Sequence, residues 1–315
     1  MNRTFLFLWV SVLLAACGGE TAENYYTPER CLAEASCPWA LVSAHRGMCG
    51  SEPENTLAAF QECARLGVTM VEVDARQTAD GIWVVMHDDD VLRTTNGGEL
   101  FPNRVKVEEL TAAEFASLTI KDDRCLENPQ ANPARCRPPL LEEVFRGVGS
   151  ELLFDLDFKA GDASSLAELV LKTGVEKRLL FFDDEFESLR AYRKVAQDGL
   201  VMARAHGAEE AGQIAAELMT ELDLRWLHVD PDYLAEARQR VDASVRLYLN
   251  AWDYQVDIWL FMAELASGEE DRLEREKKAW ALLDELLQKG ARALGTERGA
   301  QISAHLYPAG FGKQP

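Results

Sequence analysis

The sequence has little positive charge for its size. Its 315 residues include 33 Lys and Arg against 53 Asp and Glu, so the formal net charge at pH 7 is −20. This deficit excludes nucleic acid as a partner and disfavours adsorption to an anionic membrane surface. It also disfavours an anionic substrate, unless a local cluster of cations or a bound metal ion reverses the potential.

The sequence also lacks a hydrophobic run that could cross a membrane with proper flanks. Near the N-terminus, Arg3 precedes an apolar run from Phe5 to Leu14, and small residues lead to Cys17. We interpret residues 1–16 as a secretory signal peptide. The tetrad at 14–17, Leu-Ala-Ala-Cys, resembles the bacterial lipobox, in which cleavage precedes the cysteine and its thiol receives a diacylglycerol. An ordinary signal peptide with a chance cysteine is the alternative.

Lipidation of Cys17 would decide where the protein resides. Residues 17–39 would form the lipidated cysteine and a tether, so the membrane would be a partner through an N-terminal lipid anchor. Gly18 is not the acidic residue associated with retention in the inner membrane. We therefore expect an exported bacterial lipoprotein of the cell envelope, anchored in the outer membrane.

The seven cysteines show no spacing that resembles a zinc site. An exported chain meets an oxidising compartment, so the six cysteines other than Cys17 are expected to pair. Proximity in the sequence favours Cys31–Cys37, Cys49–Cys63 and Cys125–Cys136. Six cysteines allow fifteen pairings, so these three remain guesses from proximity.

No internal repeat, low-complexity segment or break divides residues 40–315. Short β-rich runs alternate with helical patterns there, which predicts a single α/β domain of the TIM (β/α)8-barrel type. The second and third runs are separated by a tight turn at 79–81 and are expected to form a hairpin. Nine runs are one more than the barrel needs, and the extra run is not identified. The runs are 40–45, 69–74, 82–87, 151–158, 178–182, 199–203, 225–230, 245–250 and 291–296.

Chemically active residues gather at the ends of these runs. His45 and Arg46 follow the first run, and Thr56 is the expected N-cap of the next helix. In α/β proteins, the end of a strand is where chemistry is usually placed. His87 ends another run, and two imidazoles near neutral pH can provide a general acid and a general base. A lone histidine at a strand end is more often structural.

Alternation along strands brings carboxylates together. Glu72 and Asp74 point to one face of a strand, and their repulsion is relieved by a hard divalent cation such as Ca²⁺ or Mg²⁺. The alternative is a pair of solvated residues at a barrel rim. Asp155, Asp157 and Lys159 share one face of a later strand, where the lysine suits a phosphate or a plain ion pair with Asp157.

Taken together, these motifs resemble the glycerophosphodiester phosphodiesterase family, a barrel of the phosphatidylinositol-phospholipase-C-like type. The resemblance covers residues 40–160, in family order and near family spacing. The matching pieces are His45-Arg46-Gly47, Pro53-Glu54-Asn55-Thr56, Glu72-x-Asp74, Asp80-Gly81, His87-Asp88, the segment from Arg93 to Gly97, and the segment from Pro139 to Val144.

The resemblance implies a role for each matching residue. His45 and His87 would be the catalytic acid/base pair, and Arg46 would bind the phosphate. Glu72 and Asp74 would be metal ligands. The family's later Glu-x-Lys falls on Asp157 and Lys159, which implies a third metal ligand and a second phosphate-binding cation. Glu54 is expected to be structural rather than a ligand.

The implied function is metal-dependent hydrolysis of a small-molecule glycerophosphodiester to an alcohol and glycerol phosphate, with one Ca²⁺ or Mg²⁺ as cofactor. Two alternatives remain at this point. The same barrel could act on a lysophospholipid or sphingolipid, as phospholipase-D-like relatives do, or it could be a catalytically silent binding lipoprotein. The silent form predicts a missing catalytic residue, and none is missing.

The chain departs from the family pattern in several places. Asp157 stands where glutamate is usual and is one methylene shorter, and Glu297 stands near the end where the family has aspartate. Past residue 160 the match thins, so substrate specificity is the property that the resemblance implies least. Phe182 and Trp252 are candidates for lining a pocket for the leaving alcohol, although an aromatic core is the expected place for both.

Overall fold

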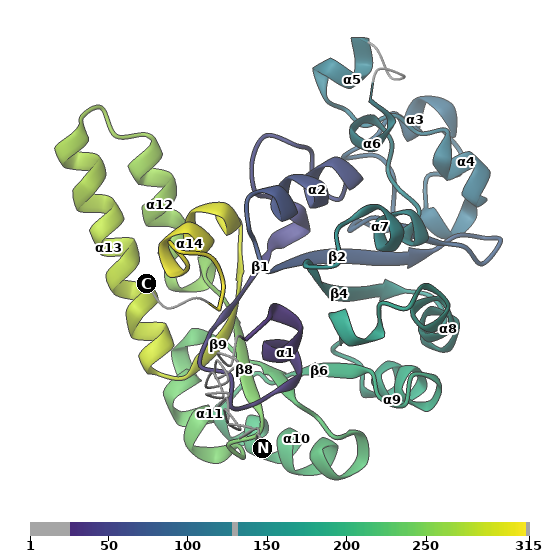
Figure 1. Cartoon of the computed structure of the whole chain (residues 1–315). Coiled ribbons are helices and arrows are strands. Elements are labelled where there is room, and N and C mark those ends of the chain that lie inside the picture. The colour runs from purple at the N-terminus through teal and green to yellow at the C-terminus, as the bar shows by residue number, and fades with distance from the viewer. Residues whose placement is uncertain (1–25, 128–131, 313–315) are drawn as a thin grey trace, which may run out of the picture.

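Eight parallel strands close into a barrel in the computed structural model, which describes residues 26–127 and 132–312. Neighbouring strands follow the order β1-β9-β8-β7-β6-β5-β4-β2, and pairing of β1 with β2 completes the ring. This confirms the predicted TIM-type barrel (Figure 1). The barrel strands are β1 (Leu41–Ala44), β2 (Met70–Gln77), β4 (Leu153–Ala160), β5 (Leu179–Phe182), β6 (Leu200–Arg204), β7 (Trp226–His228), β8 (Arg246–Asn250) and β9 (Ala291–Thr296).

The extra predicted run is the one at 82–87. It forms the short strand β3 (Trp83–Val85), which lies outside the ring. It pairs antiparallel with β2, with Ala75 opposite Val85, so the expected hairpin is confirmed. The turn between them has Gly81 at φ +81°, a left-handed conformation that glycine adopts without strain. β3 extends β2 outward and leads into a long insertion before β4.

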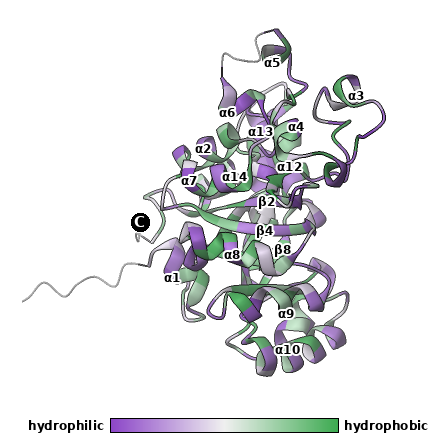
Figure 2. Ribbon diagram, turned by 90° about the vertical axis from the view of Figure 1, so that its right-hand side faces the viewer, coloured by the Kyte–Doolittle hydropathy of each residue, from purple (hydrophilic) through white to green (hydrophobic). Residues whose placement is uncertain are grey.

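Helices cover the outside of the barrel, and they show the two-sided pattern expected of a helix between core and water. Figure 2 shows hydrophobic and hydrophilic residues sharing α9 and α10. The crossover helices are α2 (Leu57–Arg65), α7 (Leu141–Gly147), α8 (Ala163–Thr173), α9 (Phe186–Val195), α10 (Ala208–Leu222), α11 (Leu234–Arg240), α12 (Val256–Glu264) and α13 (Glu269–Gln288), and α14 (Gly299–Leu306) follows β9.

In its described residues, the insertion between β3 and α7 has four short α-helices, a 3-10 turn at Val107–Glu109 and a small apolar core of its own. Val91, Leu110 and Phe115 are buried in that core. A disulfide between Cys125 and Cys136 closes the insertion, as proximity predicted. The helices are α3 (Gly97–Leu100), α4 (Ala112–Ala116), α5 (Asp123–Glu127) and α6 (Pro133–Cys136).

The folded domain begins earlier than the predicted residue 40. Helix α1 (Pro28–Ala33) closes the end of the barrel at which the strands start, and it lies in front of the barrel in Figure 1. Trp226 Nε1 donates a hydrogen bond to the Leu32 carbonyl at 3.0 Å, and Arg246 donates to the carbonyls of Leu32 and Glu34. Residues 28–39 are therefore a plug rather than a tether.

The plug is fastened by the predicted Cys31–Cys37 disulfide, and the predicted Cys49–Cys63 disulfide ties the loop after β1 to α2. Within the described part of the chain, no helix has the length and apolar character needed to cross a bilayer. The predicted signal peptide and the lipidated Cys17 lie outside the described residues.

Candidate active site

A cavity of about 110 Å³ lies at the end of the barrel where the strands finish. The residues that line it come from the barrel strands and from the loops that follow them. Its lining comprises His45, Glu72, His87, Asp155, Asp157, Lys159, Phe182, Met202, Arg204, His228, Tyr248, Asn250 and Trp252.

The turn after β1 places His45 and Arg46 at the cavity. Arg46 has φ +51° and Gly47 has φ +75°, and a Cβ added at Gly47 would lie 2.8 Å from the Phe60 ring. Only glycine fits that second position without displacing Phe60. The backbone N–H of Asn55 donates a hydrogen bond to the Arg46 carbonyl at 2.8 Å, which fixes the turn against the start of α2. Thr56 caps α2 as predicted, because its Oγ1 accepts from the Ala59 amide.

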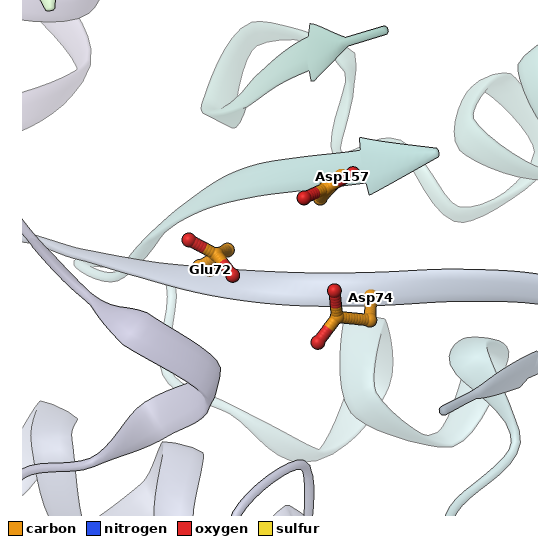
Figure 3. Close-up of side chains that lie close together, drawn as sticks. All are labelled: Glu72, Asp74 and Asp157. Atoms are coloured by element: carbon orange, nitrogen blue, oxygen red, sulfur yellow. The ribbon is translucent and has the colours of Figure 1, made fainter. Parts of the chain in front are cut away.

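The three predicted metal ligands meet inside the barrel. The parallel register pairs Asp74 on β2 with Asp157 on β4, and Glu72 lies one inward position earlier on β2. One carboxylate oxygen from each residue lies within 4.8 Å of the others. Figure 3 shows Glu72 and Asp74 on one strand and Asp157 on its neighbour. Asp157 therefore joins the group despite its shorter side chain.

The electrostatics of this acidic triad fit a bound cation. Burial and the charges of Asp74 and Asp157 raise the pKa of Glu72 well above its usual value. Burial, together with the charge of Asp74, raises the pKa of Asp157 to about 7 although Lys159 opposes the shift. Asp74 is fully buried, and among the described residues its Oδ1 accepts no hydrogen bond, although Lys159 Nζ lies 3.3 Å away. Carboxylates crowded in this way are stabilised by a divalent cation with oxygen ligands.

Two cations border the triad. Lys159 Nζ lies 2.7 Å from Asp157 Oδ2 and 3.3 Å from Asp74 Oδ1, and Arg46 Nε lies 3.7 Å from Asp74 Oδ2. Asn55 Nδ2 donates to Asp74 Oδ2 at 2.6 Å, which orients that carboxylate. The local cation cluster needed to offset the acidic surface is therefore present at the site.

His45 lies between the triad and a second carboxylate. Its Nε2 is 3.6 Å from Glu72 Oε1, its Nδ1 is 3.6 Å from Glu297 Oε1, and its ring lies 4.8 Å from that of Trp252. Burial, with the nearby charge of Arg46, lowers the pKa of His45 to about 4. A neutral imidazole at this position can accept a proton at neutral pH.

His87 is held by a chain of alternating charges. Its Nδ1 lies 2.8 Å from Asp88 Oδ1, and Arg93 Nε donates to Asp88 Oδ2 at 2.6 Å. Arg93 also donates to both oxygens of Glu54, and Glu54 Oε1 accepts from Arg46 Nη1 at 3.0 Å. This chain links His87 to Arg46, and it gives Glu54 the structural role that was expected. The sequence motif placed Arg93 in the family pattern but gave no sign of this contact.

The opposite wall of the cavity contains residues that sequence reasoning did not single out. Arg204, His228 and Asn250 end three consecutive strands, β6, β7 and β8. Their position at strand ends was the available signal. Phe182 and Trp252 line the cavity as well, and Phe182 also packs against the buried cluster around Trp226. Both carry ring contacts at the wall, Phe182 with His228 and Trp252 with His45.

Comparison with known proteins agrees with this geometry. A glycerophosphodiester phosphodiesterase of Caldanaerobacter subterraneus is 36% identical over 141 residues, which cover 44% of this chain and 51% of that protein. Human glycerophosphodiester phosphodiesterase 1 is 36% identical over 140 residues, covering 42% and 38%. The chain thus matches about half or less of the length of these curated relatives.

Solved structures share the fold at low sequence identity. A glycerophosphoryl diester phosphodiesterase from Parabacteroides distasonis superimposes with a TM-score of 0.63 at 20% identity, covering 90% of this chain and 93% of that one. An Oleispira antarctica phosphodiesterase in complex with sn-glycerol-3-phosphate gives 0.60 at 19% identity, covering 84% and 96%. The profile of the glycerophosphoryl diester phosphodiesterase family matches residues 45–283. The chain belongs to the glycerophosphoryl diester phosphodiesterase family.

Proposed function

We propose that this protein hydrolyses glycerophosphodiesters to an alcohol and glycerol phosphate. One arrangement carries the proposal: Glu72, Asp157, Lys159 and the two histidines line a single cavity at the catalytic end of a barrel. Asp74 completes the acidic triad and Arg46 lies beside it. The matching curated relatives carry this activity in their names. The glycerol-3-phosphate complex of the Oleispira enzyme supports the same reaction class.

The residues of this chain have distinct tasks in that reaction. Glu72, Asp74 and Asp157 would hold one divalent ion, which supplies positive charge to the phosphoryl oxygens when bound. Arg46 and Lys159 bind the same oxygens from the side of the triad, and preorganised charges of this kind usually contribute most to such catalysis. Ca²⁺ and Mg²⁺ both suit three carboxylate ligands.

The proton transfers fall to the two histidines. One imidazole removes a proton from the attacking water as its oxygen bonds to phosphorus. The other donates a proton to the alkoxide as its bond to phosphorus breaks. His45 is neutral at pH 7 and therefore ready to accept a proton, and His87 is oriented by Asp88. The products are one alcohol and glycerol phosphate.

The lining of the cavity favours a deacylated substrate over a lysophospholipid. Charged or polar side chains form most of that lining. An acyl chain would find few apolar partners among them. An assay with glycerophosphocholine and lysophosphatidylcholine, each with and without a chelator, tests both the metal requirement and the substrate class. Full turnover in a chelated, metal-analysed sample would reject the metal, and faster turnover of the lyso-lipid would reject the substrate class.

We also propose that the protein is exported and anchored by lipid on Cys17. The three disulfides support an oxidising compartment. Metabolic labelling with a radioactive fatty acid should mark the wild type and not the Cys17→Ser variant. An unlabelled wild type would overturn the anchor and leave the enzymatic proposal intact.

A further inference from the structure

The cavity wall opposite the triad is built from adjacent strands and has its own chemistry. The register pairs Arg204 on β6 directly with His228 on β7, and His228 with Tyr248 on β8. Arg204, His228 and Asn250 all line the cavity that holds the triad. A substrate whose phosphate lies at the triad therefore extends one of its two organic groups toward this wall.

Two groups on this wall have unmet hydrogen-bonding capacity. His228 is 5% exposed, and within the described chain its Nε2 has no hydrogen-bond partner. Arg204 Nη2 donates to Asp230 Oδ1 at 3.3 Å, whereas its buried Nε donates to no described residue. Buried polar groups are nearly always paired in proteins, so unpaired ones at a cavity mark a place where a ligand can supply the partner.

The wall carries charges of both signs. Asp230 offsets the charge of Arg204, and burial lowers the pKa of His228 to about 3, so that its ring stays neutral. Asn250 has its side-chain hydrogen bond with Asp253. Asp253 also interacts with Arg204, so this arginine has two carboxylates near it. Hydrogen-bond donors and acceptors are therefore both present on the wall. A hydroxyl group both donates and accepts, so it matches such a surface.

We propose that Arg204, His228 and Asn250 form a subsite for a neutral, polyhydroxylated head group, such as inositol or glycerol, and select it over choline. This inference rests on the proposed function, because the head group is the alcohol released. All three residues lie beyond residue 160, where the family motifs thin out. That placement suits a subsite for the part of the substrate that varies between diesters.

Choline cannot satisfy this wall. Its trimethylammonium group neither donates nor accepts a hydrogen bond, and its hydroxyl oxygen is esterified to the phosphate. It would leave Arg204 Nε and His228 Nε2 without hydrogen-bond partners. Sites that hydrogen-bond a substrate hydroxyl strongly reject analogues that lack it. We expect wild-type kcat/KM to favour the hydroxylated diester by roughly 10- to 100-fold.

The test compares kcat/KM of the full-length, metal-supplemented protein for glycerophosphoinositol, glycerophosphoglycerol and glycerophosphocholine. Arg204→Met and His228→Phe should each reduce the preference for the hydroxylated substrates to within about threefold. His228→Gln keeps hydrogen-bonding capacity and should retain part of the preference. Arg190→Met is the matched control, because Arg190 on α9 pairs with Glu217 and Glu221 away from the cavity. Its preference should equal that of the wild type.

The outcomes separate the two proposals. If the Arg204 and His228 variants lose activity equally on all three substrates, the wall binds the shared glycerol phosphate or is only structural, and this inference is overturned. A wild type that prefers glycerophosphocholine, or has no preference, overturns it and leaves the proposed function standing. A wild type that hydrolyses none of the three overturns both. Inhibition by free myo-inositol should be stronger than inhibition by choline in the wild type and not in Arg204→Met.

Discussion

Two imidazoles face the cavity, and each is expected to carry one proton transfer. His45→Ala and His87→Ala should each lower kcat by about 10²–10⁴-fold with little change in stability, since both side chains are partly exposed. The kcat of the double variant should be only slightly below that of the less active single variant, because the two groups act as a unit. Steady-state kinetics on a natural diester and thermal unfolding provide the measurements.

A substrate with a good leaving group assigns the two roles. A nitrophenyl diester does not need a general acid, so it should restore the rate of whichever variant lacks the acid. His305→Ala is the control, since His305 stacks on Trp280 at 4.0 Å and does not line the cavity. Near-normal rates for both active-site variants on a natural diester would show that the histidines are structural and that this mechanism is wrong.

A buried carboxyl behind the last strand gives stability a defined pH dependence. Asp257 accepts hydrogen bonds from Thr296 Oγ1 at 2.6 Å and from the Glu297 amide at 2.8 Å. Burial nevertheless raises the pKa of Asp257 to about 6. An unfolded aspartate titrates near pH 3.9, so between about pH 4 and 6 the folded state binds more protons. The contribution of Asp257 to stability is therefore lost as pH rises through this window.

Asp257→Asn removes this titration. The stability of the variant relative to the wild type should rise by about 3 kcal/mol between pH 4 and pH 7, measured by urea unfolding. Asp198→Asn, at an exposed turn, is the control and should show no such change. Parallel pH profiles of the Asp257 variant and the wild type would mean that the carboxyl is not perturbed in the folded state.

At the scale of elements, the insertion before α7 supports the loop that follows β1. Arg135 on α6 is 5% exposed and pairs with Glu52 of that loop and with Asp122 at 2.8 Å. The neighbouring Cys136 is joined to Cys125. The disulfide therefore fixes the helix whose arginine holds the loop between the His45 turn and Glu54.

Replacing both cysteines by serine should loosen this support. Cys125→Ser with Cys136→Ser should cost roughly 2–3 kcal/mol of unfolding free energy and raise KM for the diester. The matched control is Cys31→Ser with Cys37→Ser, which removes a disulfide from the plug at the other end of the barrel. That pair should lower stability without changing KM. Equal KM values in the two double variants would contradict a supporting role for the insertion.

The two sides of the active site differ in how well the sequence predicts them. Period-two alternation placed Glu72 and Asp74 on one face, and the motif at 157–159 supplied the third carboxylate, because these patterns are local. The wall of Arg204, His228 and Asn250 could not be assembled in this way. Its members are separated by more than twenty residues each and meet only through strand register.

At the scale of the whole molecule, the active-site cavity lies at one end of the barrel and the plug of residues 28–39 closes the other. Arg246 is 3% exposed and donates to carbonyls of the plug. Arg246→Met removes these two charge-assisted hydrogen bonds, while the Leu32 carbonyl keeps Trp226 and the Glu34 carbonyl keeps the Cys37 amide as donors. The loss should lower the unfolding free energy by about 2–4 kcal/mol. kcat should stay within about twofold, because the plug lies away from the reacting groups.

The adjacent arginine provides the comparison for that variant. Arg225 is more exposed and pairs with Asp223 at 2.8 Å on the surface, so Arg225→Met should change stability by less than about 1 kcal/mol. Urea unfolding of the two variants measures the difference. Equal stability of Arg246→Met and the wild type would show that the plug adds nothing to the fold.

The plug also constrains the order in which the chain can fold. The carbonyls of the plug bond to Trp226 and Arg246, which lie 194 to 214 positions later in the chain. Contacts this distant in sequence form only after the intervening strands are in place. The plug can therefore complete its docking only once β8 is available, and sealing of this end is a late event in the folding of the barrel.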